Sequence, residues 1–213
     1  MNKIIFITGG ARSGKSSFSE ELALFLSEKN TNKKIAYLAT AEVFDKEMKE
    51  RVAHHKARRG ELFLTYEESI AVDKVIDAIY NDHNIFLFEC FSTWLGNIYH
   101  KKNKEPEKYT MKILSNIFLK FNGNISIKKT NSVYEKLLFS ENKKFDIKLT
   151  DIIRKKSDDK FLIIVSNEVN MGIIPESKLS RDYRDHLGRL NQFTADNADF
   201  VFFLLSGNPV RIK

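Results

Sequence analysis

Cysteine is almost absent from the sequence, which holds Cys90 and no other. A disulfide framework and a zinc site built from cysteines are therefore excluded within one chain. Cys90 lies inside the apolar run "IFLFECF", and a thiol in such a run is expected to be a small core residue rather than a nucleophile.

Long apolar runs are missing as well. None approaches the roughly 20 residues that a membrane-spanning helix needs. The start, "MNK", leads directly into a short apolar strand pattern without the hydrophobic stretch of a signal peptide. We therefore expect a cytoplasmic protein without a membrane span. The 213 residues, of which 42% are hydrophobic and 30% charged, are enough for one domain with a substantial core.

The net charge of +7 is confined to one part of the chain. Residues 101–160 hold 16 Lys+Arg against 8 Asp+Glu, whereas the rest of the chain holds 19 against 20. Few aromatic residues lie among these lysines to stack on bases. A solvated, lysine-rich surface is therefore expected here, and not a nucleic-acid interface.

Short apolar runs alternate with segments of helical spacing. Strands are predicted at 3–8, 33–41, 61–68, 84–90, 160–169 and 199–207. Helices are predicted at 15–29, 45–59, 69–82 and 180–198, with another beginning near residue 93. Strands that are apolar throughout and alternate with helices predict a single α/β domain over 1–213, its mainly parallel sheet covered on both faces. The basic segment at about 104–159 is predicted to form a surface excursion of helices and a loop.

A glycine-rich stretch follows the first predicted strand and precedes the first predicted helix. It matches the pattern G-x4-G-K-[ST] with the residues Gly9, Gly10, Ala11, Arg12, Ser13, Gly14, Lys15 and Ser16. Its backbone N–H groups can surround an anion, and the following helix directs its positive dipole end to the same place. Lys15 can neutralise the β- and γ-phosphates, and Ser16 can bind Mg²⁺. The motif predicts a nucleoside triphosphate site in a P-loop NTPase (RecA-like) fold.

An acidic residue at the end of a neighbouring strand usually completes the magnesium site of such a loop. Glu89, which ends the run "IFLFE", is the best placed, and Glu168 is the second candidate. For Glu89, a solvated carboxylate at a strand end remains the alternative.

Two adjacent histidines lie in the predicted helix "DKEMKERVAHHKARR". On a helix, His54 falls on the charged face between Arg51 and Arg58, whereas His55 leans towards the apolar face. A neutral imidazole among arginines can attack a phosphorus atom, but a solvated histidine on a charged helix fits the same pattern. Their spacing does not suit zinc.

Five segments of the sequence resemble one family in the same order. They are "TGGARSGKS", "YLATAEVFDKEMKERVAHHKARR", "FECFSTWLGN", "VSNEVNMGIIPE" and "RDYRDHLGRLNQFTADNADFVFFLLSGNPVRIK". They are similar to the bifunctional adenosylcobinamide kinase/adenosylcobinamide-phosphate guanylyltransferases of cobalamin biosynthesis, over about residues 3–100 and 160–213. The resemblance implies two reactions. ATP or GTP phosphorylates the aminopropanol hydroxyl of adenosylcobinamide, and GTP then guanylylates a histidine that passes GMP to the cobinamide phosphate, giving adenosyl-GDP-cobinamide.

The resemblance also implies roles for particular residues. The guanylylated histidine of the family, the first of the pair, falls on His54. Nucleotide contacts fall on Ala39, Thr40, Ala41, His55, Lys56, Ala57, Arg58, Glu67 and Glu89. Mg²⁺ is expected at Ser16 and Glu89, and a homotrimer with nucleotide near a subunit boundary is implied.

One departure and two alternatives remain at this point. Asn170 stands where the family has a glycine in "NEVGMG"; if that position needs positive φ, asparagine is the next most tolerant residue, and the turn can survive. A P-loop kinase without guanylylation would transfer phosphate but form no covalent GMP. A nucleic-acid-dependent ATPase using 101–160 as its basic surface would show steeply salt-dependent binding.

Overall fold

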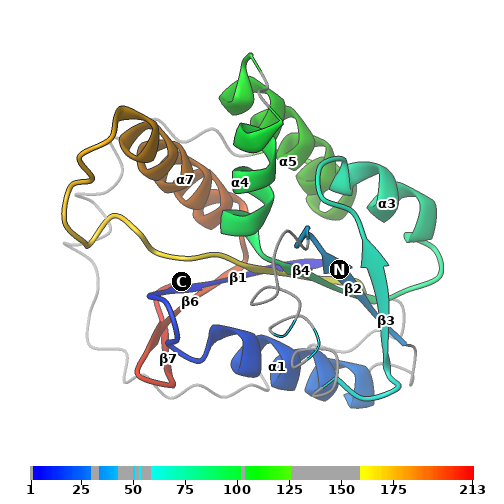
Figure 1. Ribbon diagram of the computed structural model, residues 1–213. Helices are drawn as coiled ribbons and strands as arrows, with labels where there is room; N and C mark the ends of the chain where they lie inside the picture. Colours follow the sequence, from blue (N-terminus) through cyan, green and yellow to red (C-terminus); the bar gives the residue numbers. More distant parts are fainter. Residues whose placement is uncertain are drawn as a thin grey trace.

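The computed structural model describes residues 2–29, 34–42, 50, 53, 59–101, 104–125 and 159–213. These residues form one seven-stranded sheet with the order β3-β2-β4-β5-β1-β6-β7 (Figure 1). The strands are β1 (Lys3–Gly9), β2 (Ile35–Ala39), β3 (Phe63–Glu67), β4 (Ile85–Glu89), β5 (Phe161–Val165), β6 (Phe200–Leu205) and β7 (Asn208–Arg211). All neighbouring pairs are parallel except β6 and β7.

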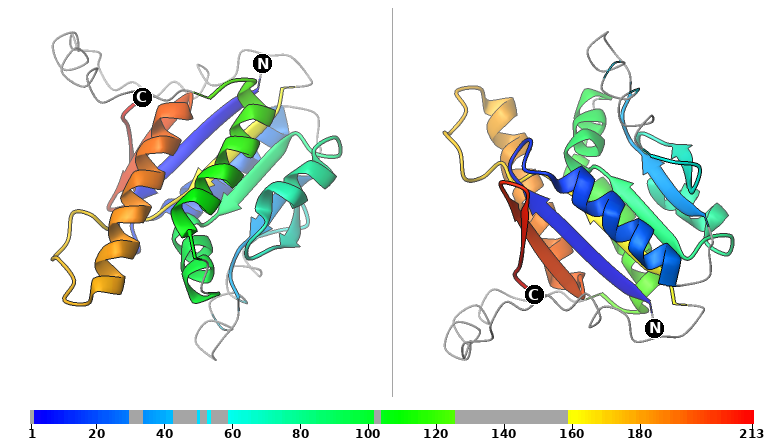
Figure 2. Two further views of the ribbon diagram at one scale, coloured as in Figure 1. Left: turned by 90° about the horizontal axis from the view of Figure 1, so that it is seen from above. Right: turned by 90° about the horizontal axis from the view of Figure 1, so that it is seen from below.

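Helices cover both faces of the sheet. They are α1 (Lys15–Lys29), α3 (Val72–Ile79), α4 (Phe91–His100), α5 (Pro106–Asn122) and α7 (Lys178–Asn197). Figures 1 and 2 show α1 on one face and the other four on the opposite face. The predicted fold class, a mainly parallel sheet with helices on both faces, is confirmed. The helix predicted at 45–59 lies mostly outside the described residues.

The alternation of side chains along each strand divides the core in two. In β1, Ile4 and Phe6 pack under α3, α4, α5 and α7, whereas Ile5 and Ile7 pack against α1. Neighbouring residues of a strand point to opposite faces, so a sheet covered on both sides needs strands that are apolar at every position. This is why the apolar runs of the sequence predicted the strands well.

Over residues 106–122, helix α5 differs from the predicted surface excursion at 104–159: a helix is present, as predicted, but it packs in the core. The helix begins at Pro106 and ends before Gly123, whose φ is 71°, and both residues are common at helix boundaries. Its apolar stripe is buried and consists of Ile113, Leu114, Ile117, Phe118 and Phe121. The start of the segment is therefore part of the core. The prediction missed this because the positive charge of the whole segment 101–160 was weighed above the apolar stripe of this helix, which holds three lysines among its 17 residues. Residues 126–158 lie outside the described residues.

A second difference concerns the end of the chain. The strand predicted at 199–207 is shorter, and β7 follows it as an antiparallel partner. Ser206 and Gly207 form the two-residue turn, with φ of 51° and 84°. Positive φ at both central residues is the requirement of a type I′ hairpin turn. None of the described helices combines the length and apolar composition needed to cross a membrane.

Replacing the buried Phe118 tests whether α5 is a core element. Phe118 is fully buried and its ring lies 5.5 Å from that of Phe193. Phe118→Ala is expected to lower the free energy of unfolding by about 3–5 kcal/mol, because it leaves a cavity between α5 and α7. Urea unfolding measures this loss. Leu119→Ala is the control, since Leu119 is exposed on the same helix; equal losses in both variants would contradict a core position for α5.

Candidate functional site

The predicted phosphate-binding loop connects the end of β1 to the start of α1. Its backbone has positive φ at Gly9 (152°), Arg12 (57°) and Gly14 (92°). Alternating backbone conformations of this kind direct successive N–H groups inward and form a concave anion site. Because α1 begins at Lys15, its positive dipole end adds to the same site. The structure therefore brings the predicted loop residues into the expected arrangement.

The hairpin between β6 and β7 supports this loop from outside. A Cβ atom at Gly9 would lie 2.6 Å from the carbonyl oxygen of Leu204, and one at Gly14 would lie 3.2 Å from the Cα of Gly207. The backbone N–H of Gly207 donates a hydrogen bond to the carbonyl of Ser13 (3.0 Å). Sequence reasoning missed this contact, although the Ser-Gly pair signals a turn.

Lys15 lies inside the loop. It is 8% exposed, and its Nζ donates to the carbonyl of Gly10 at 2.5 Å. Burial lowers the pKa of Lys15, and the carboxylate of Glu89 opposes that shift. A cation that is already desolvated interacts strongly with an anion placed beside it. Lys15 is therefore suited to phosphate binding.

Glu89 and Ser16, the two residues predicted to bind Mg²⁺, are in direct contact. The hydroxyl of Ser16 donates to Oε1 of Glu89, and the hydroxyl of Tyr37 donates to Oε2 at 3.1 Å. Glu168, the second candidate, instead accepts a hydrogen bond from the backbone N–H of Asn170 (2.8 Å). The geometry therefore favours Glu89 over Glu168 as the partner of Ser16.

Ser16 and Glu89 can supply two of the ligands of a magnesium ion. A hydroxyl and a carboxylate are hard oxygen donors, which Mg²⁺ prefers. The described residues contain no group of three or more His, Cys, Asp or Glu side chains that could hold a metal. Phosphate oxygens and water would therefore complete the coordination of a Mg²⁺ ion at Ser16 and Glu89.

Tyr37 and Arg59 extend this arrangement, and sequence reasoning missed both. The guanidinium carbon of Arg59 lies 3.4 Å from the centre of the Tyr37 ring, a cation–π contact. Burial and the charge of Glu89 both raise the pKa of Tyr37, so its hydroxyl remains a donor to Glu89. The only available signal was a phenol in the otherwise apolar strand "IAYLA".

The remaining predicted residues divide into two groups. Ala39 pairs in register with Glu67 on one side and Glu89 on the other, so the three lie in one row across β3, β2 and β4. The backbones of Glu67 and Glu89 are thus two strand spacings apart, about 10 Å. Thr40 follows Ala39, and its Oγ1 lies 3.2 Å from the backbone nitrogen of Cys90. The residues outside the described part of the chain are His54, His55, Lys56, Ala57 and Arg58.

Cys90 meets its predicted role as a core residue only in part, since it packs against the core at the edge of the α1 side. It is only half-buried and directly precedes α4 at the edge of the site. Its Sγ lies 3.2 Å from the hydroxyl of Ser92, which also accepts a hydrogen bond from the side chain of Asn167 (2.8 Å). Cys90 has these polar neighbours because β4 ends at Glu89, so Cys90 itself lies beyond the end of the strand.

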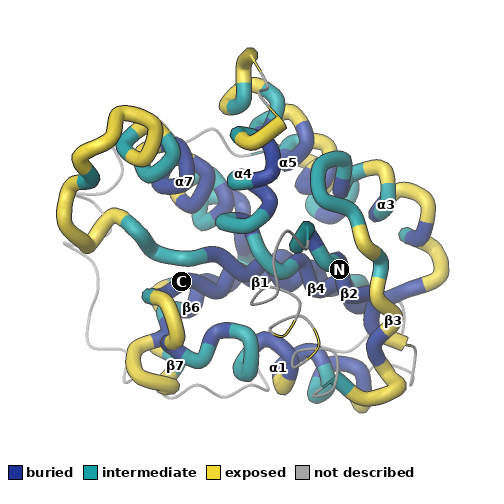
Figure 3. Tube along the Cα trace, in the orientation of Figure 1, coloured by how far each residue is buried: buried dark blue, intermediate teal, exposed yellow. Residues whose placement is uncertain are grey.

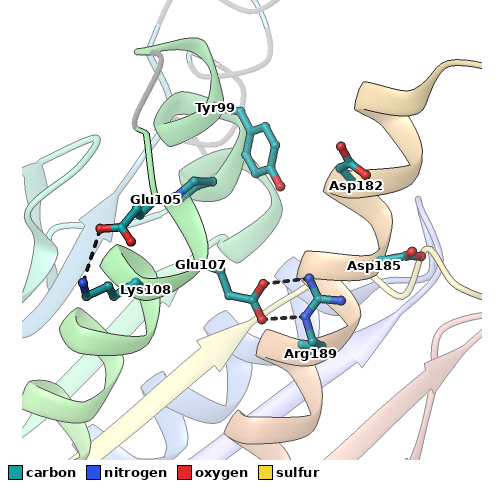
Figure 4. Close-up of a pocket in the computed structure, with 8 residues that line it drawn as sticks. Tyr99, Glu105, Glu107, Lys108, Asp182, Asp185 and Arg189 are labelled. Carbon is teal, nitrogen blue, oxygen red and sulfur yellow. Dashed lines mark hydrogen bonds and ion pairs between the residues drawn. The ribbon is translucent and has the colours of Figure 1, made fainter.

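A hollow of about 630 Å³ lies elsewhere, between α4, α5 and α7 (Figure 4). Its lining includes Tyr99, Asp182 and the ion pair of Arg189 with Glu107 (2.6 Å). None of the residues predicted for nucleotide binding lines it. The hollow is therefore separate from the P-loop site.

Comparison with known proteins gives a consistent result. The family model described as cobinamide kinase / cobinamide phosphate guanyltransferase matches residues 5–212. The chain is 31% identical to the bifunctional adenosylcobalamin biosynthesis protein CobU of Escherichia coli and of Salmonella typhimurium, covering 99% of both chains in each case. It is 28% identical to the protein CobP of Pseudomonas aeruginosa, over 97% of this chain and 95% of the relative. A similarity to a solved ATPase domain has a TM-score of 0.40 at 10% identity, covering 95% of this chain and 69% of that one.

The two adjacent glycines of the loop provide a matched test. Gly9→Ala is expected to destabilise the protein by about 2–5 kcal/mol and to abolish nucleotide binding. The reasons are a backbone conformation unsuited to alanine and overlap with the Leu204 carbonyl. Gly10→Ala meets nothing within 4 Å and should keep most of its stability. Thermal unfolding and fluorescent-nucleotide titration measure both effects, and equal behaviour of the two variants would disprove the constraint.

Proposed function

Because the chain belongs to the cobinamide kinase / cobinamide phosphate guanyltransferase family, we propose that it carries out both reactions of that name. It phosphorylates the aminopropanol hydroxyl of adenosylcobinamide with a nucleoside triphosphate, then transfers GMP from GTP to the resulting phosphate. The product is adenosyl-GDP-cobinamide. The main structural support is the P-loop with Lys15 inside it and Ser16 joined to Glu89.

In the kinase step, positioning and charge stabilisation do most of the work. The loop N–H groups and Lys15 hold the β- and γ-phosphates. The acceptor hydroxyl attacks the γ-phosphorus, a new P–O bond forms, the bond to the β-phosphate oxygen breaks, and the hydroxyl proton is released. The buried position of Lys15 strengthens its attraction to the charge that moves onto the leaving oxygen.

Mg²⁺ is proposed to bind at Ser16 and Glu89. When bound, it neutralises charge on the β- and γ-phosphate oxygens. Tyr37 orients the carboxylate of Glu89 through its hydroxyl, and Arg59 packs on the ring of Tyr37. These two residues are therefore proposed to position Glu89.

His54 is proposed as the nucleophile of the second reaction. Its imidazole nitrogen attacks the α-phosphorus of GTP, forming an N–P bond while the bond to pyrophosphate breaks. A phosphate oxygen of the cobinamide phosphate then takes the GMP and frees the histidine. Support comes from the charged helix face and the family resemblance.

The family resemblance also supports a homotrimer with the nucleotide near a subunit boundary. Such an assembly would place residues of a neighbouring copy beside the P-loop. Size-exclusion chromatography with light scattering measures the number of copies in solution.

Tyr37→Phe tests the proposed support of Glu89. The variant keeps the ring under Arg59 but removes the hydroxyl donated to Glu89, so about tenfold more Mg²⁺ is expected for half-maximal activity. Kinase assays over a range of Mg²⁺ concentrations measure this shift. The control is Tyr80→Phe, which removes a tyrosine hydroxyl that donates to the carbonyl of Lys120, away from the site. An unchanged Mg²⁺ requirement in Tyr37→Phe would show that Tyr37 does not support the metal site.

The mass of the intact protein after incubation with GTP and Mg²⁺ tests the second reaction. The unaltered protein is expected to gain one acid-labile GMP, and His54→Ala none, because the nucleophile is lost. His55→Ala is the matched control and should keep the gain. A gain in His54→Ala would assign the covalent step to another residue. No gain in any variant, with phosphate still transferred, would leave a kinase without guanylylation.

A further inference from the structure

The segment 169–179, between β5 and α7, starts beside the P-loop and exposes large apolar side chains. Met171 is 81% exposed, Ile173 94%, Ile174 67% and Leu179 66%. Figure 3 shows this connection as an exposed arm that leaves the buried sheet. Several large apolar side chains exposed within eleven residues commonly mark a binding site. We refer to these four side chains as the apolar platform.

The backbone of the platform is held at both ends. At its start, the backbone N–H of Asn170 donates to the carboxylate of Glu168 (2.8 Å). At its end, the guanidinium of Arg181 donates to the carbonyls of Pro175 (3.0 Å) and Glu176. Ser177 then caps α7 by accepting from the N–H of Ser180. Polar contacts therefore anchor the backbone on both sides of Met171, Ile173 and Ile174.

Asn170 takes part in this anchoring. Its side chain lies against α7 at Gly188, where an added Cβ atom would overlap with Nδ2 of Asn170. Asn170 is not among the described residues with positive φ, so this position does not require a glycine. The replacement of the family's glycine therefore fits the turn and adds a contact with α7.

The start of the platform is joined to the phosphate-binding loop. The backbone N–H of Glu168 donates to the carbonyl of Gly9 (2.9 Å). Met171 follows three residues later, so its Cα lies within roughly 10 Å of that contact. In Figure 1 the segment leaves the sheet at the same edge as the P-loop and runs outward to α7.

We infer that the apolar platform binds the corrin macrocycle of the acceptor substrate. The inference rests on the proposed function, in which the acceptor is a cobinamide. This molecule combines a broad ring carrying methyl groups with amide arms, and the reacting hydroxyl is on one arm. The apolar side chains suit the ring and its methyl groups, while the arm extends to the P-loop. Both reactions act on the same arm, so a fixed platform beside the loop serves them both.

The double variant Met171→Ser/Ile173→Ser tests the inference. Both side chains are exposed, so folding should not suffer. Equilibrium dialysis with cobinamide, followed by its visible absorbance, is expected to show at least about tenfold weaker binding, because two apolar contacts are lost. The KM for the nucleotide and the GMP gain with GTP should be unchanged.

Ile212→Ser is the matched control for the double variant. Ile212 is 64% exposed. Its backbone N–H donates to the carbonyl of Val201 near the start of β6, at the end of the strands opposite to the P-loop. Its cobinamide affinity should equal that of the unaltered protein. Equal affinity in the double variant would overturn the inference. A double variant that changes the number of associated copies but not the cobinamide affinity would also overturn the inference, because a second copy of the chain would then be the occupant of the platform. If the unaltered protein binds no cobinamide, the proposed function fails and the inference with it.

Discussion

The close approach of the P-loop to strand β6 is the constraint on which the site depends. The carbonyl of Leu204 leaves no space for a side chain at Gly9, and the turn at Gly207 is hydrogen-bonded to Ser13. The last hairpin of the chain therefore holds the path of a loop near its beginning. Because α1 starts directly after this loop, the positions of Lys15 and Ser16 depend on the same contact.

From Ser16 a series of contacts runs across the sheet. Ser16 is bonded to Glu89, Glu89 to Tyr37, and the ring of Tyr37 lies under Arg59. Arg59 immediately follows the segment that carries the two histidines. The series therefore connects the loop proposed to hold the triphosphate with the segment proposed to supply the nucleophile.

The family resemblance and the structure inform different parts of the site. The resemblance assigns roles by matching position, and the structure adds residues that no motif contained. Tyr37, Arg59 and the hairpin glycine Gly207 were missed because each acts through a partner distant in sequence: Tyr37 through Glu89, Arg59 through Tyr37, and Gly207 through Ser13. Helix α5 was misjudged for a related reason. It was grouped with the lysine-rich residues that follow it, and the burial of its stripe depends on neighbours from distant parts of the chain.

The sequence by itself determined the six parallel strands and the phosphate-binding loop, and it ranked Glu89 first as the acidic residue facing that loop. Each of these depends on local chemistry: strands buried on both faces must be apolar throughout, the loop needs glycines between a strand and a helix, and Glu89 ends a strand. Only the tertiary structure decided what supports those parts. The hairpin against Gly9, the phenol behind Glu89 and the anchored apolar platform arise from contacts between residues far apart in the chain. Local patterns carry no information about such contacts, because the packing of the whole sheet determines which strand ends meet.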